Sequence, residues 1–135
     1  MSSKAEIDVV TAEFFGAFDN RGGKAADLDR IRRLVLPDAV ITMTGPQFTV
    51  WTVDEFLEPR RVLLGAGGRL AEFSEWETYE RTEIAGDIAS RFGEYRKSGL
   101  LDGKPFEGAG TKTIQFVRTR DGWRITAFAW YDHQP

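Results

Sequence analysis

Apolar positions in the first fifth of the chain follow a helical period. The periodic positions are Ile7, Val10, Phe14 and Phe18, joined by Thr11 and Phe15. Their spacing of three or four residues predicts a helix over 4–19. Ser3 and Glu6 form a capping-box pattern at its start, and the stretch NRGG at 20–23 ends it.

Two further helical segments frame a short β-rich stretch. A second helix is expected between Asp27 and Pro37, because its apolar residues fall on one side. AVITMT (39–44) and QFTVW (47–51) predict two short strands joined at Gly-Pro. Thr52 and Glu55 then form a second capping box, and the third helix they begin should be kinked or divided at Pro59.

From residue 69 onward the pattern changes to that of strands. The expected strands are 70–84, 87–98, 108–119 and 122–132, separated by AGD, GLLDGKP and TRDG. Helices followed by a long antiparallel sheet predict an α+β fold. We find no internal repeat or linker, and expect a single domain over 1–135.

The last expected strand, GWRITAFAWYD, has large aromatic residues on both faces. Alternation places Trp123 and Tyr131 on one side and Phe128 and Trp130 on the other. One of these faces therefore has to be covered by something other than solvent.

Composition limits the possible partners. The net charge of −3 and the lack of any long basic run argue against nucleic acid or an anionic membrane as the main partner. The chain contains no cysteine and shows neither a signal peptide nor a long apolar segment, so a cytoplasmic location is expected. A single histidine without cysteine predicts no nitrogen- or sulfur-rich metal site.

The order of these elements resembles the nuclear transport factor 2-like superfamily, which includes ketosteroid isomerase, scytalone dehydratase and the SnoaL-type cyclases. LPDAVITMTG, TVDEFLEP and FVRTRDGWRIT carry the likeness, which covers nearly the whole chain. The resemblance implies a cone-shaped fold, with three N-terminal helices packed on a strongly curved mixed, mainly antiparallel β-sheet. Because members include enzymes and non-catalytic proteins, it implies no particular reaction.

The resemblance also implies a pocket between the concave face of the sheet and the helices. Alignment on the last strand of isomerase-like members turns Trp123, Ile125, Ala127, Ala129 and Tyr131 inward. The residues expected to bind a ligand are Phe14, Trp51, Trp76, Tyr95, Phe116 and Tyr131. Alternatively, Phe14, Phe56 and Trp76 plug the cavity.

The outward aromatic stripe that this alignment produces predicts a dimer. Phe92, Phe128 and Trp130 would lie on the outer face of the sheet, where relatives commonly pair, and we expect a homodimer through this face. The alternative is that Arg and Lys stems or the C-terminal tail cover these rings within one monomer.

The residues that catalyse the ketosteroid isomerase reaction are replaced in this chain, so that chemistry is disfavoured. In the alignment, Met43 replaces the aspartate base, while Phe14 and Ile114 replace the two oxyanion donors. His133 lies three residues from the end, where a mobile tail residue is more common than a catalyst.

Polar and charged residues within the strands remain as candidates for catalysis: Glu77, Arg91, Tyr95 and Lys112. The alignment that turns Tyr95 inward also turns Arg91, Lys97 and Lys112 inward, with Glu75 and Glu77 as the nearest counter-charges. Such a pocket could orient a carboxylate or enolate on an aromatic ligand. The alternative is that these charges form cross-strand ion pairs on a solvated face.

Two functions stay open at this point. One is a cofactor-free acid–base enzyme of the cyclase, dehydratase or isomerase type, acting on a small apolar or aromatic molecule. The other is a non-catalytic dimeric module that binds a ligand or a protein. Arg60 and Arg61 either guard the pocket mouth or form an exposed helical pair.

Overall fold

The computed structural model describes residues 1–134, which form three α-helices and one sheet. In chain order the elements are α1 (Ser3–Gly16), the short 3₁₀ turn η1 (Arg21–Gly23), α2 (Asp29–Leu34), β1 (Val35–Met43), β2 (Thr49–Trp51), α3 (Val53–Leu64), β3 (Leu70–Ala85), β4 (Ile88–Leu101), β5 (Lys104–Thr119) and β6 (Gly122–Asp132). The sequence-based boundaries of the last four strands agree with these to within four residues.

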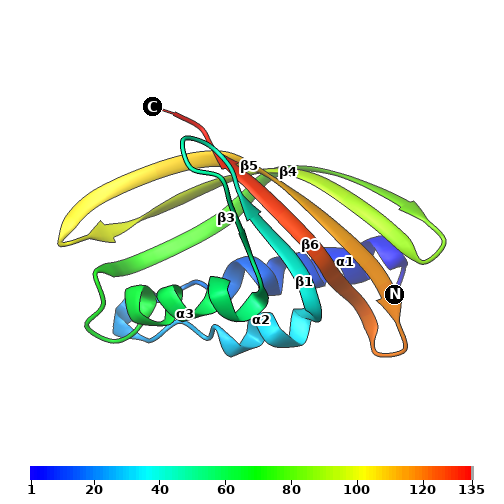
Figure 1. The fold of residues 1–135 in the computed structure, drawn as a ribbon, viewed down its shortest axis with the longest axis horizontal. Helices are drawn as coiled ribbons and strands as arrows, with labels where there is room; N and C mark the ends of the chain where they lie inside the picture. Colours follow the sequence, from blue (N-terminus) through cyan, green and yellow to red (C-terminus); the bar gives the residue numbers. More distant parts are fainter. Residues whose placement is uncertain (135) are drawn as a thin grey trace.

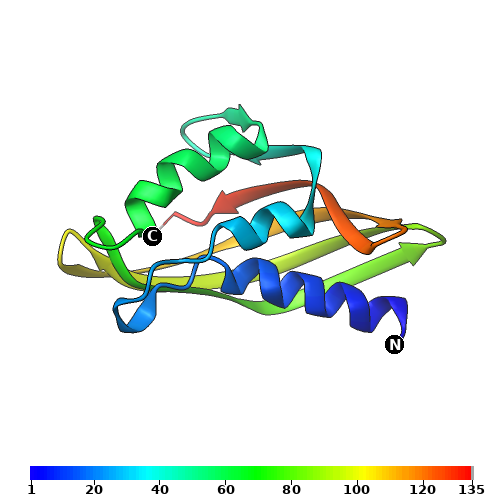
Figure 2. The same ribbon diagram turned by 90° about the horizontal axis from the view of Figure 1, so that it is seen from below.

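The six strands form one mixed sheet in the order β2-β1-β6-β5-β4-β3. All neighbouring pairs are antiparallel except β1 and β6, which are parallel. Figure 1 shows the long strands arching over the helices, and Figure 2 shows the three helices together on one face of the sheet. This arrangement confirms the predicted α+β cone fold.

The helix ends follow the capping signals, with two corrections. The Thr52–Glu55 capping box is confirmed, with nitrogen–oxygen distances of 2.9 and 3.2 Å. At α1 the cap is Ser2 and not Ser3, because the Ser2 hydroxyl accepts from the Ala5 N–H. Pro59 does not divide α3: the residue is exposed, so water can satisfy the carbonyl that loses its donor.

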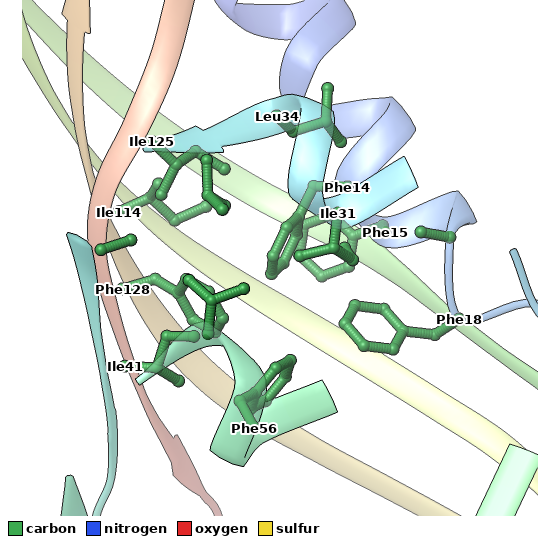
Figure 3. Close-up of a cluster of buried hydrophobic side chains, with 14 of the residues drawn as sticks. Phe14, Phe15, Phe18, Ile31, Leu34, Ile41, Phe56, Ile114, Ile125 and Phe128 are labelled. Carbon is green, nitrogen blue, oxygen red and sulfur yellow. The ribbon is translucent and has the colours of Figure 1, made fainter. Parts of the chain in front are cut away.

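The helices pack on the sheet through a cluster of aromatic rings. Phe14 of α1 and Phe56 of α3 both contact Phe128 of β6, with ring centroids 4.8 and 5.4 Å apart and edge-to-face geometry. Figure 3 shows these rings pointing toward one another between the helices and the sheet. Phe14 and Phe128 are therefore core residues, which is incompatible with Phe128 facing outward as the alignment suggested.

A β-bulge in β6 explains why the side-chain alternation on this strand was wrong. Phe116 of β5 pairs with Ile125 and Gln115 pairs with Ala127, so Thr126 has no partner. The extra residue reverses the alternation. Before the bulge, Trp123 and Ile125 face inward as predicted; after it, the inward residues are Phe128, Trp130 and Asp132, while Ala127, Ala129 and Tyr131 face out.

Two further irregularities curve β3 around the helices. The pairing with β4 shifts between Ala71 and Ser74 and again between Glu77 and Tyr79. At the first shift, buried Asn20 donates to the carbonyl of Leu70 (2.7 Å) and accepts from the Phe73 N–H (2.8 Å). Asn20 also donates to the carbonyl of Leu64 at 3.2 Å, which ties the start of β3 to the end of α3.

Candidate functional site

A cavity of about 170 Å³ lies between α3 and the concave face of the sheet. It is smaller than the roughly 300–1,000 Å³ typical of pockets for drug-sized ligands, so it suits a small molecule. Its walls come from the segment that follows α1, from α3, and from the four strands β3 to β6. The lining residues are Phe18, Phe56, Arg60, Leu63, Leu64, Leu70, Phe73, Glu75, Tyr95, Lys97, Phe106, Lys112, Phe128, Trp130 and Asp132.

Aromatic rings form much of the apolar wall. Phe128 and Trp130 of β6 lie against Phe56 of α3, and the ring centroids of Phe56 and Trp130 are 5.8 Å apart. Across the cavity, Phe73 of β3 stacks on Phe106 of β5 at 6.3 Å. These rings create an apolar volume in which any polar group has more electrostatic influence than in water.

A carboxylate with two donors lies where β6 ends. The Tyr95 hydroxyl and the Lys97 ammonium both donate to Oδ1 of Asp132, the latter at 3.0 Å. Burial, followed by this bond to Asp132, raises the pKa of Tyr95 above its ordinary value. Tyr95 is therefore a neutral donor at physiological pH.

Gly110 provides the space that this arrangement needs. A Cβ at this position would lie 2.2 Å from the Tyr95 hydroxyl oxygen, well inside van der Waals contact. Gly110 pairs with both Tyr95 on β4 and Asp132 on β6. Only glycine therefore lets the hydroxyl cross β5 to reach the carboxylate.

A second ion pair lies deeper in the cavity. Lys112 Nζ donates to Glu75 Oε2 at 2.8 Å, and both side chains are largely buried. The ammonium also lies 4.7–5.0 Å from the ring centroids of Phe15, Tyr95 and Phe14. Carboxylate and ring faces together compensate the buried charge.

Arg60 of α3 contributes the remaining charge. Its guanidinium carbon lies 3.9 Å from the centroid of Phe56, 5.2 Å from that of Trp51 and 5.5 Å from that of Trp130. Nη1 donates to the carbonyl of Phe56 at 3.1 Å. Burial lowers the pKa of Arg60 to about 10, with Glu75 and Asp132 only partly offsetting it.

The structure divides the predicted catalytic candidates into two groups. Tyr95 and Lys112 line the cavity. Arg91 lies outside it, held by Glu77 at 2.6 and 3.0 Å and by Asp8 of α1 at 2.7 Å. Glu75 and Glu77, the counter-charges expected nearby, form ion pairs, and the structure assigns Glu75 to Lys112 and Glu77 to Arg91.

Of the predicted ligand-binding residues, only Tyr95 lines the cavity. Phe14 and Phe116 are fully buried in the core, and Trp51 packs beside the wall against Phe56. Trp76 and Tyr131 are 43% and 47% exposed, so the prediction that they face the cavity is wrong. For Tyr131 the error follows from the bulge in β6, which changes the face that each later residue occupies. Trp76 follows the cavity residue Glu75 on β3, so ordinary alternation turns it to the other face.

The predicted dimer-interface residues also separate. Phe92 lies on the outer face of the sheet and is 39% exposed. Phe128 is in the core and Trp130 lines the cavity, stacked on Trp51 with centroids 5.9 Å apart. Placing these two rings on the outer face was therefore wrong, and the question raised by the two aromatic faces of β6 is answered within the monomer.

Asp132 was missed as a cavity residue, and Arg60 was considered only as a guard of the pocket mouth or as part of an exposed pair. Asp132 was assigned to the outward face because the bulge at Thr126 has no sequence signal of its own. Arg60, by contrast, stands four residues after Phe56 and three before Leu63, a spacing that places the three on one helical face. His133 lies outside the cavity beside the Thr111 hydroxyl, at 2.9 Å.

Residues 1–134 contain neither a cluster of metal ligands nor a helix suited to span a membrane. No group of three or more His, Cys, Asp or Glu side chains is placed to hold a metal ion. None of the helices in this part of the chain combines the length and the apolar character that crossing a membrane requires.

Known structures share this architecture, although no family model and no curated protein matches the sequence. A protein from Novosphingobium aromaticivorans described as a candidate aromatic ring hydroxylase matches with a TM-score of 0.83, 19% identity, and coverage of 98% of this chain and 90% of that chain. A nuclear transport factor 2-like superfamily protein from Salmonella enterica serovar Typhimurium matches with a TM-score of 0.80 and 14% identity, and the match covers 98% of this chain and 92% of that chain. The hexachlorocyclohexane dehydrochlorinase LinA-type3 from Novosphingobium barchaimii matches with a TM-score of 0.77 and 18% identity, and the match covers 98% of this chain and 87% of that chain. The chain therefore has the nuclear transport factor 2-like fold, as the resemblance of its sequence implied.

Proposed function

We propose that the protein binds a small organic molecule in the cavity and transfers a proton to or from it, with Asp132 as the acid–base group. The observation that carries this proposal is that Asp132 lines the aromatic-walled cavity, with its side chain 44% exposed and with Tyr95 and Lys97 both bonded to Oδ1. No hydrogen bond from residues 1–134 reaches Oδ2. That oxygen is available to take a proton from a ligand.

The two donors give Asp132 a fixed orientation. Tyr95 stays protonated because burial and the bond to Asp132 raise its pKa, and Lys97 offsets the negative charge. When Oδ2 takes a proton, both donors keep their contacts with Oδ1, so the carboxyl group does not need to rotate. Preorganisation of this kind is the main contribution that a small cavity can make to proton transfer.

The chemistry of one structural neighbour supports this class of reaction. The LinA-type3 protein is named as a dehydrochlorinase, and loss of hydrogen chloride includes removal of a proton. At 18% identity, the likeness to that protein assigns no specific substrate to this chain. What supports the proposal here is the carboxylate in the cavity.

Proton exchange at carbon provides the test. Cyclohexanone and phenylpyruvate in D₂O report base catalysis by loss of their NMR signals next to the carbonyl. The wild type should accelerate exchange of at least one probe, and Asp132→Asn should lower that rate about 10²- to 10⁴-fold. Asp102→Asn is the matched control, because Asp102 pairs with Arg69 outside the cavity.

Two outcomes would contradict the proposal. Exchange in Asp132→Asn at the wild-type rate would exclude Asp132 as the base. Exchange no faster than in buffer, together with no change in melting temperature on adding either probe, would favour the non-catalytic alternative. Tyr95→Phe should keep the carboxylate and lose only part of the rate.

We further propose that two copies pair through the outer face of the sheet. A groove on that face, of about 350 Å³, is bordered by Val40, Phe92, Ala127 and Ala129. Val40 on β1 and Phe92 on β4 are 49% and 39% exposed at either side of this groove, so the face presents large apolar side chains to solvent. Light scattering should give the dimer mass for the wild type and the monomer mass for Phe92→Glu, with Phe48→Glu, in the β1–β2 turn, as the exposed control.

A further inference from the structure

Arg60 is the one cavity charge without an ionic partner among residues 1–134. Lys97 pairs with Asp132 and Lys112 pairs with Glu75, at 3.0 and 2.8 Å. Every other charged side chain that lines the cavity belongs to one of these two pairs. The cavity therefore consists of two neutral pairs and one guanidinium, an excess of one positive charge.

The guanidinium has donors to spare. Its face is covered by the rings of Phe56, Trp51 and Trp130, and one N–H donates to the Phe56 carbonyl. A guanidinium carries five N–H groups, all in its plane, so its edge keeps donors that the rings cannot satisfy. That edge is where a carboxylate binds, with two parallel hydrogen bonds.

The charge of Arg60 is also poorly compensated. Aromatic faces attract a cation, but more weakly than a carboxylate in contact does. The pKa of Arg60, lowered to about 10 by burial, reflects this incomplete compensation. An anionic ligand would compensate the charge of Arg60, whereas a neutral ligand would bury that charge further without compensating it.

We propose that the natural ligand is a small monocarboxylate, with its carboxylate on the edge of Arg60 and its apolar body against the aromatic walls. This inference rests on the proposed function and specifies its substrate class. The cavity volume of about 170 Å³ accommodates one six-membered ring with short substituents. A single positive excess matches a monoanion, while a dianion such as a phosphate ester would face Glu75 and Asp132 with one charge unpaired.

This orientation also positions the ligand for the proposed reaction. Arg60 lies on α3 and Asp132 lies on β6, and both side chains line the cavity without forming an ion pair with each other. A carboxylate on Arg60 therefore leaves the rest of the ligand to reach Asp132. Arg60 would select the ligand and set its orientation, and Asp132 would exchange the proton.

Matched acids and amides test the inference directly. Titration calorimetry compares benzoate with benzamide and cyclohexanecarboxylate with cyclohexanecarboxamide, pairs that differ in charge and hardly in shape. The wild type should bind at least one acid 10-fold or more tightly than its amide. Arg60→Gln should reduce this preference to within about 2-fold, while Arg61→Gln, on the same helix but paired with Asp29, should keep it.

The outcomes separate this inference from the proposed function. Equal binding of acids and amides, or an acid preference that survives Arg60→Gln, would overturn the inference. Failure of every acid to bind the wild type would overturn it too. Accelerated exchange of neutral cyclohexanone would in either case leave the proposed function standing. The thermal melt of Arg60→Gln shows that the variant is folded, and a folded variant with unchanged amide binding makes a loss of acid binding specific to the charge.

Discussion

Arg91 and Arg60 are both drawn into the protein, yet their surroundings differ in kind. Arg91, 5% exposed, contacts Glu77 and Asp8 directly, and Glu80 lies 3.6 Å away. Arg60 contacts three rings and a backbone carbonyl and no carboxylate among residues 1–134. The guanidinium of Arg91 is fully paired with carboxylates and joins elements of the fold. The guanidinium of Arg60 has no carboxylate partner, which is why we propose that it binds a ligand.

The network around Arg91 connects the N-terminal helix to the sheet. Asp8 of α1 accepts from Arg91 of β4 and from Lys4, and Lys4 also donates to Glu80 of β3 at 2.8 Å. Gly93 makes room for it, since a Cβ there would lie 2.7 Å from the Glu77 carboxylate. The catalytic role considered for Arg91 and Glu77 from the sequence is therefore not needed to explain their burial.

The largest expected effect is the loss of the Arg91 network. Arg91→Met leaves the carboxylates of Glu77 and Asp8 without their main partner, and breaking a buried pair of this kind costs about 3 kcal/mol in the free energy of unfolding. Urea denaturation measures this loss. Arg96→Met, on the exposed face of the same strand, should change stability by less than about 0.5 kcal/mol.

A loss below about 1 kcal/mol for Arg91→Met would contradict the comparison. It would mean that the network behaves like an exposed ion pair, and that Arg91 and Arg60 are not distinguished by how well they are satisfied. Affinity of the cavity for benzoate should stay unchanged in Arg91→Met, because Arg91 does not line the cavity.

The sequence predicted which side chains face inward correctly where a strand is regular, and incorrectly beyond a bulge. β4 and β5 pair without a register shift, so simple alternation correctly turned Tyr95, Lys97 and Lys112 inward. β3 and β6 each contain bulges, and on β6 the alternation failed beyond Thr126. A bulge depends on how a strand bends around its partners, a property that local sequence does not carry.

The fold itself was predictable because its signals are redundant. Helical periods, the Thr52–Glu55 capping box and the glycine-containing turns each mark boundaries independently. The cavity depends instead on single residues such as Asp132, for which an error of one position exchanges inside and outside. Arg60 was the exception, since its helical spacing with Phe56 and Leu63 was readable.

The second expected effect is loss of stability in acid. Burial raises the pKa of Asp8, but hydrogen bonds from Arg91 and Lys4 outweigh it, and bonds from Lys4 and Thr82 lower the pKa of Glu80. Because both folded-state pKa values lie below the unfolded ones, the stabilisation is complete above about pH 5 and is lost as the pH falls through the folded-state values.

Urea midpoints at pH 7 and pH 3 measure this acid sensitivity. After discounting for the partial exposure of Asp8, the two groups should account for about 1 to 2 kcal/mol of the difference. Asp8→Asn should lower stability at pH 7 and flatten the pH dependence. An identical pH dependence in Asp8→Asn and wild type would remove Asp8 from the network.

The smallest expected effect has the opposite sign. Arg60→Met replaces an incompletely compensated buried charge with an apolar side chain of similar length, among the rings of Phe56, Trp51 and Trp130. The ligand-free protein should gain about 0.5 to 1 kcal/mol, measured by urea denaturation, because binding sites commonly retain groups that cost stability.

Arg61→Met is the matched control on α3. Arg61 pairs with Asp29 at 2.6 Å on the surface, so its loss should lower stability by no more than about 0.5 kcal/mol. A loss of stability in Arg60→Met larger than in Arg61→Met would show that the rings and the Phe56 carbonyl already satisfy the guanidinium. Arg60 would then resemble Arg91, as a residue that holds α3 on the sheet, and the reason for expecting an anionic ligand would be gone.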